Sequence, residues 1–130
     1  MKTELNKKNN QTTVVIDVSY KVENNVVKDF IRDEHASTFF NLKDDGILRF
    51  EWYLNEEDKT GTLIEVFENS QVWEELGNKL IGSPINLRFR ELFTIKKITV
   101  LGEISEAFKE KLKPMSPPIV KSYIGGIRQD

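Results

Sequence analysis

Apolar and polar positions first alternate clearly in residues 13–20, TVVIDVSY, a segment rich in β-branched residues. Successive side chains of a β-strand point to opposite faces, so Val14, Ile16, Val18 and Tyr20 would share one face. The segment is predicted to be a strand with that face in the core.

The spacing changes in residues 24–41, where apolar side chains recur every four positions. This is the period of a helix with one buried side. The buried side of the predicted helix carries Val27, Ile31, His35 and Phe39, with Phe30 beside them. Residues 43–46, KDDG, have the composition of a turn and are predicted to follow the helix.

Two more strands and a second helix are predicted next. Residues 47–54, ILRFEWYL, and 62–68, TLIEVFE, alternate as strands, and the polar segment 55–61 between them is predicted to be a hairpin loop. Asn69 or Ser70 is predicted to cap the following helix. The inner side of that helix carries Val72, Trp73, Leu76 and Leu80.

The remainder of the chain adds one more strand and one more helix. Residues 94–102, TIKKITVLG, are predicted to be a strand, and Ser105 is predicted to cap a helix that stops at Pro114. Residues 84–93 begin with a proline and have the composition of a short helix, although a strand also fits their pattern. Residues 119–124, IVKSYI, are a candidate edge strand.

The predicted elements follow the order β-α-β-β-α-β, with one extra helix near the C-terminus. This is the order of the ferredoxin-like fold, and it predicts an α+β protein with helices on one face of a four-stranded antiparallel sheet. A chain of 130 residues fits one domain of this kind. We expect residues 1–12 to be a flexible tail and residues 13–127 to form the domain.

The second face of the predicted sheet mixes charged, hydroxyl and aromatic side chains. Such a face is too polar for a core and too aromatic for a face that meets only water. It fits contact between the sheets of two copies, so a homodimer is predicted. The residues assigned to the dimer or barrel face are Asp17, Arg49, Glu51, Tyr53 and Glu65.

Glu65 is the unusual residue of that set, because it lies at the centre of an otherwise apolar strand. An unpaired buried charge is costly, so a carboxylate in this position either faces the surface beside a cation or lines a polar site. One interpretation pairs Glu65 with Arg49 or Lys97 on a neighbouring strand. The other interpretation places Glu65 in a ligand cavity. The register of the strand decides, and the first interpretation puts Ile64 and Val66 under the helices.

Composition restricts the chemistry and the partners. The chain has no cysteine and one histidine, and its formal net charge is −2. No metal or haem is therefore expected. Nucleic acid and membrane are not expected as partners, because the basic residues are spread out and no apolar run is long enough to span a bilayer. The polar residues 1–12 do not resemble a signal peptide, so a cytoplasmic protein is expected.

His35 is the candidate catalytic residue. It is the one side chain of this sequence whose ordinary pKa suits a general base near neutral pH, although a lone histidine on an apolar helix side is also a common packing residue. Phe39, Trp52 and Trp73 are the candidate substrate-binding residues. Each of these aromatic side chains has core packing as the alternative role.

Two segments of the chain resemble a known family. GTLIEVFENSQVWEEL (residues 61–76) and FRELFTIKKITVLGEISEAFKEKL (residues 89–112) resemble the antibiotic biosynthesis monooxygenase-like family of dimeric α+β barrels. The resemblance implies a homodimer whose two sheets face each other as an α+β barrel, with a pocket in each subunit between the sheet and its helices. It also implies a cofactor-independent monooxygenase for a small hydrophobic aromatic substrate, of quinol or polycyclic type, in which the bound substrate itself activates oxygen.

The haem-degrading branch of that family uses an asparagine, a tryptophan and a histidine. Trp73 matches the tryptophan, but no histidine follows it, so haem degradation is not expected. The alternative function is a non-catalytic dimeric module, either small-molecule-binding or regulatory, since one scaffold hosts many roles.

Overall fold

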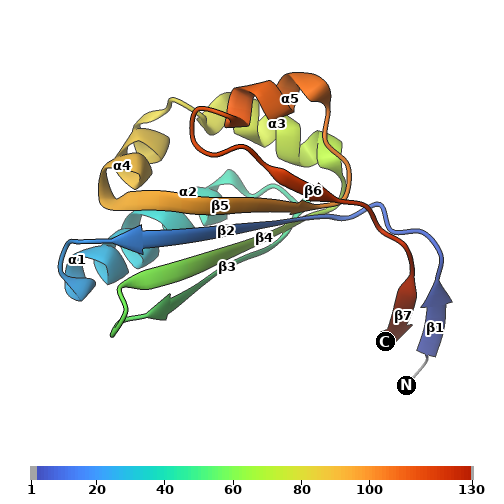
Figure 1. Cartoon of the computed structure of the whole chain (residues 1–130), viewed down its shortest axis with the longest axis horizontal. Helices are drawn as coiled ribbons and strands as arrows, with labels where there is room; N and C mark the ends of the chain where they lie inside the picture. Colours follow the sequence, from blue (N-terminus) through green and yellow to red (C-terminus); the bar gives the residue numbers. More distant parts are fainter. Residues whose placement is uncertain (1–2, 130) are drawn as a thin grey trace.

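A five-stranded sheet with helices over one face is the main body of the protein, seen in the computed structural model of residues 3–129 (Figure 1). The strand order is β3-β4-β2-β5-β6. The strands are β2 (Thr12–Tyr20), β3 (Ile47–Asn55), β4 (Thr60–Phe67), β5 (Phe93–Leu101) and β6 (Ile119–Lys121). The first four pair antiparallel with one another, and β6 lies parallel to β5. The α+β class and the ferredoxin-like order are confirmed.

Two helical crossovers connect the strands. The first is helical throughout and consists of α1 (Asn24–Asp29), the π-helix η1 (Phe30–His35) and α2 (Ala36–Leu42). The second consists of α3 (Ser70–Leu80) and α4 (Pro84–Leu92), so residues 84–92 are helical and not a strand. The extra helix, α5 (Glu106–Leu112), follows β5.

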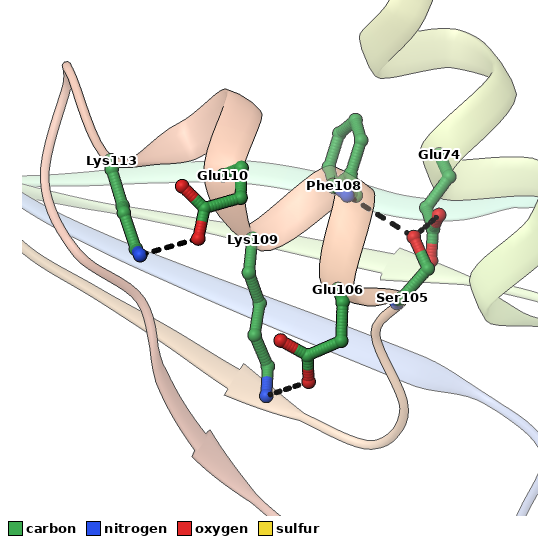
Figure 2. Close-up of polar contacts among 7 residues, drawn as sticks. All are labelled: Glu74, Ser105, Glu106, Phe108, Lys109, Glu110 and Lys113. Atoms are coloured by element: carbon green, nitrogen blue, oxygen red, sulfur yellow. Dashed lines mark hydrogen bonds and ion pairs between the residues drawn. The ribbon is translucent and has the colours of Figure 1, made fainter.

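Local caps fix where α3 and α5 begin, as predicted. The side chain of Asn69 accepts a hydrogen bond from the backbone N–H of Val72, at 2.9 Å. Ser105 Oγ accepts one from the N–H of Phe108, at 3.2 Å, and its hydroxyl donates to Glu74 on α3 (Figure 2). Caps of this kind contribute about 1 kcal/mol each. The contact between Ser105 and Glu74 also ties α5 to α3, and these two helices form one wall of the cavity described below.

The core consists of two apolar clusters, and β2 contributes to both. Val14 packs with Trp73 and Phe108 under α3 and α5. Val18 packs under the first crossover and α4, in the cluster that contains Phe30 and Phe89. The predicted apolar face of this strand is therefore the face that meets the helices.

The predicted register of β4 is wrong by one residue. Glu65 stands opposite Val14 of β2 and Phe50 of β3, both of which point toward the helices. Leu63, Glu65 and Phe67 therefore face the helices, and Ile64 and Val66 lie on the other face. The alternation alone does not select a face, because both sets are apolar. Phe67 and Leu63 are the larger pair, and burying them under the helices removes more apolar surface from water.

The two ends of the chain form a separate two-stranded arm beyond the sheet (Figure 1). β1 (Thr3–Asn6) pairs antiparallel with β7 (Gly126–Gln129), so residues 3–6 are not the flexible tail that was predicted, and the ordered structure continues past residue 127. The pairing joins opposite ends of the sequence, so no local pattern indicates it. Residues 1–2 of the predicted tail lie outside the described residues. Within residues 3–129, the helices are too short or too polar to cross a membrane.

Candidate functional site

A cavity of about 110 Å³ lies between the sheet and the helices. The sheet contributes Val14, Ile16, Leu63, Glu65, Phe67, Ile95 and Ile98 to its wall. The helical elements contribute His35, Phe39, Trp73, Leu76, Gly77, Leu80, Ile85, Asn86, Phe89, Phe108 and Leu112, and Ile81 and Met115 lie at their ends. The wall is apolar except for His35, Glu65 and Asn86. An engineered apolar cavity of about 150 Å³ binds benzene, so this somewhat smaller cavity suits at most a molecule of about one small ring.

Glu65 places a carboxyl group in the wall of this cavity. Its side chain is buried, with 7 % of its surface exposed, and among the described residues it has no hydrogen bond or ion pair. Burial raises the pKa of Glu65 to about 8, because the charged form loses its hydration. At neutral pH the group is therefore mainly an uncharged carboxylic acid.

His35 lies in the same wall, inside a group of aromatic rings. Its imidazole stacks on Phe30 with ring centroids 5.3 Å apart and forms a T-shaped pair with Phe50, with ring centroids 4.9 Å apart. Burial lowers the pKa of His35 to about 3. The imidazole is therefore neutral near pH 7, and it does not titrate there as the predicted general base would.

One hydrogen bond decides which imidazole nitrogen carries the proton. The indole N–H of Trp52 donates to His35 Nδ1 at 3.1 Å. An indole nitrogen can only donate, so Nδ1 is the acceptor, and the proton of the neutral ring is on Nε2. Trp52 thus fixes the orientation of the His35 ring through this hydrogen bond, and Trp52 is not part of the cavity wall.

The π-helix η1 determines where His35 sits. The N–H of Ala36 bonds to the carbonyl of Ile31, a spacing of five residues, which widens this turn. The wide turn leaves Phe30, Ile31 and His35 all buried. Single π-turns inside α-helices are frequent at functional sites.

The other predicted site residues divide between the cavity and the open face of the sheet, the face that no helix covers. Phe39 and Trp73 line the cavity. The four charged or aromatic residues predicted for the dimer face, Asp17, Arg49, Glu51 and Tyr53, lie on the open face. There Asp17 accepts a hydrogen bond from Thr62 at 2.8 Å, and Arg49 pairs with Glu51.

Glu65 does not join that face, which corrects the prediction that it is a barrel-face carboxylate paired with a cation. Arg49 uses Glu51 as its partner, and Lys97 stands opposite Asp17. The interpretation that placed Glu65 in a ligand cavity is therefore the one that the structure favours. Its signal in the sequence is a carboxylate in the middle of an apolar strand, which has no low-cost place except beside a cation or a ligand. Asn86 was missed, since nothing in its local sequence marks it.

Gly77 on α3 allows the ring of Phe108 to pack directly against the helix. A Cβ at this position would lie 2.3 Å from Phe108 Cζ. Gly77→Ala is therefore expected to push the ring into the cavity, reduce its volume and weaken the binding of phenol, used as a single-ring probe of the cavity, at least tenfold, although alanine is the better helix former by about 1 kcal/mol. Calorimetric titration with phenol measures the effect. Lys79→Ala, at an exposed position of the same helix, is the control, and equal phenol affinity in the two variants would contradict this account of the wall.

Comparison with protein-family models and with curated proteins gives no match for this chain. Solved structures do match. The crystal structure of MupZ from Pseudomonas fluorescens is similar with a TM-score of 0.63 and 19 % identity, over 94 % of this chain and 93 % of that one. A structural-genomics structure of the protein YJCS is similar with a TM-score of 0.50 and 18 % identity, over 73 % of this chain and 99 % of that one. At these identities the similarity shows a shared fold, and it supports the α+β, ferredoxin-like assignment.

Proposed function

We propose that this protein is an enzyme that moves a proton to or from a small, largely apolar molecule, with Glu65 as its acid and base. The observation that carries the proposal is the buried carboxyl group of Glu65, which has no partner among the described residues and lines an apolar cavity. Leaving such a group unpartnered costs free energy of folding. Strongly perturbed groups of this kind in cavities are typical of catalytic sites.

The pKa of Glu65 suits this role. General acids and bases work best when their pKa lies near the operating pH. With a pKa of about 8, Glu65 is mostly protonated at pH 7, yet a fraction of roughly one tenth is ionised and can accept a proton. Glu65 can thus donate a proton in its protonated form and accept one in its ionised form.

The reaction that we propose first is the cofactor-independent oxygenation implied by the resemblance to the antibiotic biosynthesis monooxygenase-like family. Ionised Glu65 would remove a proton from an acidic phenol or methylene group, and the resulting anion would react with dioxygen. For a methylene group, CH₂ and O₂ give C=O and H₂O, so no other oxidant is needed. The size of the cavity favours a single-ring substrate over a polycyclic one.

Binding without turnover is the second candidate, since an apolar cavity with a few polar groups is also the usual form of a simple ligand site. Oxygen uptake with hydroquinone, substituted phenols and anthrone separates the two. An enzyme should consume oxygen with the single-ring compounds, and it should lose that activity in Glu65→Gln. Tight binding of these compounds without oxygen consumption or proton exchange would favour the binding module.

We also propose that two copies pair through the open face of the sheet, as the family resemblance implies. The open face carries half-buried Val15 and Ile64 beside the exposed ring of Tyr53, and no helix lies over it (Figure 1). Apolar side chains of this kind beside polar ones are typical of an interface.

The expected result is a homodimer at tens of micromolar protein that buries more than about 1,000 Å² in total. Arg49→Glu should weaken it, because the new carboxylate would lie beside Glu51 in the interface. The matched control is Glu57→Lys in the loop between β3 and β4. Analytical ultracentrifugation measures both, and a monomeric wild-type protein would refute the pairing.

A further inference from the structure

The imidazole of His35 lines the cavity and carries an uncharged hydrogen-bond donor. Its Nδ1 accepts the N–H of Trp52, which leaves the proton on Nε2. Among the described residues, Nε2 has no hydrogen-bond partner, although the side chain is only 7 % exposed. Nε2 is not among the fully buried polar atoms that lack a partner, of which Ser83 Oγ is the one in the described residues, so this N–H keeps some accessible surface and is available to a ligand.

His35 and Glu65 both line the cavity, and both lie beside Phe50. Phe50 stands opposite Glu65 across β3 and β4, and the ring of Phe50 lies 4.9 Å from the imidazole. No hydrogen bond joins His35 to Glu65, so both groups are available to bind a ligand. Behind the imidazole, Trp52 and the surrounding rings hold its orientation.

The cavity holds no permanent charge to pair with an ionic ligand. His35 and Glu65 are its ionisable side chains, and both are uncharged near neutral pH because of burial, which shifts the pKa of each away from neutrality. An ion moved into such a wall would lose hydration without gaining a counter-ion. An uncharged molecule with an acceptor oxygen would instead gain hydrogen bonds from the imidazole N–H of His35 or the carboxylic acid of Glu65.

We infer that the cavity recognises an uncharged carbonyl compound of about one ring, whose oxygen accepts the Nε2–H of His35 while its α-carbon faces Glu65. The part of this inference that concerns proton transfer rests on the proposed function. Ionised Glu65 takes the α-proton, and the electron pair of the C–H bond forms the C=C bond of an enolate. The negative charge on the enolate oxygen is stabilised by His35. Return of the proton to carbon restores the ketone, so the step needs no oxidant or reductant.

Nuclear magnetic resonance tests the recognition directly, because the chain has a single histidine. In ¹⁵N-labelled protein at pH 7, the imidazole should show the Nε2–H tautomer, and cyclohexanone should shift the Nε2 and Hε2 resonances. Methylcyclohexane, which has the ring without the oxygen, should leave them in place. Cyclohexanecarboxylate should bind at least tenfold more weakly than cyclohexanone. An Nδ1–H tautomer, or a carboxylate that binds as well as the ketone, would overturn the inference.

Two variants separate recognition by His35 from general packing. His35→Phe keeps an aromatic ring in place and should weaken cyclohexanone binding about tenfold, the effect of one hydrogen bond, with methylcyclohexane affinity changed less than twofold. Trp52→Phe keeps the packing but removes the donor to Nδ1, so the Nδ1–H tautomer should appear in the spectrum. If His35→Phe does not fold, the tautomer change and weakened ketone binding in Trp52→Phe still decide the question.

Exchange of the α-protons of cyclohexanone in D₂O distinguishes the inference from the proposed function. Ketone binding with the expected shift of His35 but without exchange would support the recognition and contradict the role of Glu65 in catalysis. Exchange that depends on Glu65 but is insensitive to His35→Phe would leave the proposed function standing and overturn the inference.

Discussion

Glu65→Gln is expected to lower the rate of proton transfer in the cavity by about 100- to 10,000-fold, the usual contribution of a positioned general acid or base. Glutamine has nearly the shape of glutamic acid and is uncharged, as Glu65 itself mostly is at pH 7. It can neither accept nor release a proton under these conditions. The affinity for an uncharged ligand should therefore change only a few-fold, so that the loss appears in kcat rather than in KM.

The measurement is α-proton exchange or oxygen uptake at saturating ligand, with Glu57→Gln as the control. Glu57 is exposed in the loop between β3 and β4, so its substitution should leave both parameters unchanged. The wild-type rate should also rise with pH up to the pKa of Glu65, because ionised Glu65 is the base. A Glu65→Gln variant that keeps more than a tenth of the rate would show that another group moves the proton.

The predictable parts of this site are those set by short-range pattern. The four-residue spacing places His35 and Phe39 on the buried side of the first crossover, and the sequence around Asn69 fixes the start of α3, which presents Trp73 to the cavity. These positions follow from helix period and capping, which act within a few residues of the chain.

The position of Glu65 depends on a long-range choice that the local sequence leaves open. β4 has apolar residues on both faces, Leu63 and Phe67 on one and Ile64 and Val66 on the other. The face is selected when the strand packs against the completed helical layer, and the bulkier pair is then buried. A shift of one residue moves every side chain of a strand to the other face. The wrong register therefore also assigned the carboxyl group of Glu65 to the open face.

The hydrogen-bond partner of His35 could not be predicted from local sequence for a similar reason. Trp52 lies 17 residues away, on β3, and reaches Nδ1 only because η1 turns the histidine inward. The spacing of apolar residues in the first crossover fits an ordinary α-helix, so it does not indicate a π-turn. The arm formed by β1 and β7 joins the two ends of the chain and is likewise absent from any short window.

A second large effect is expected in the pH dependence of stability. Burial raises the pKa of Glu65 from 4.5 to about 8 and lowers the pKa of His35 from 6.5 to about 3. Since one pKa unit corresponds to about 1.4 kcal/mol, each displacement is worth roughly 5 kcal/mol over its whole pH window. The two groups act in opposite directions, because folding favours the protonated form of Glu65 and the deprotonated form of His35.

The signs follow from which state binds more protons. Between pH 4.5 and 8, folded Glu65 keeps a proton that the unfolded chain has released, so the free energy of unfolding falls as the pH rises. Between pH 6.5 and 3, the unfolded chain takes up a proton that folded His35 does not, so the free energy of unfolding falls as the pH decreases. The slopes cancel where the windows overlap. Wild-type protein should therefore be most stable between about pH 4.5 and 6.5 and lose stability on both sides.

Urea unfolding at pH 3.5, 5.5 and 8 of the wild type and two variants separates the contributions. Glu65→Gln should abolish the loss of stability between pH 5.5 and 8 and keep the loss at acid pH. His35→Phe should do the reverse. Its free energy of unfolding should still fall between pH 5.5 and 8, and the part of the loss below pH 5.5 that His35 causes should disappear. Other groups also titrate at acid pH, so the difference between each variant and the wild type carries the result. A wild-type profile that is flat from pH 5.5 to 8, and unchanged by Glu65→Gln, would mean that Glu65 is ionised in the folded protein. In that case the cavity would hold a charge, and it would not be the neutral site on which the proposed recognition of an uncharged ligand depends.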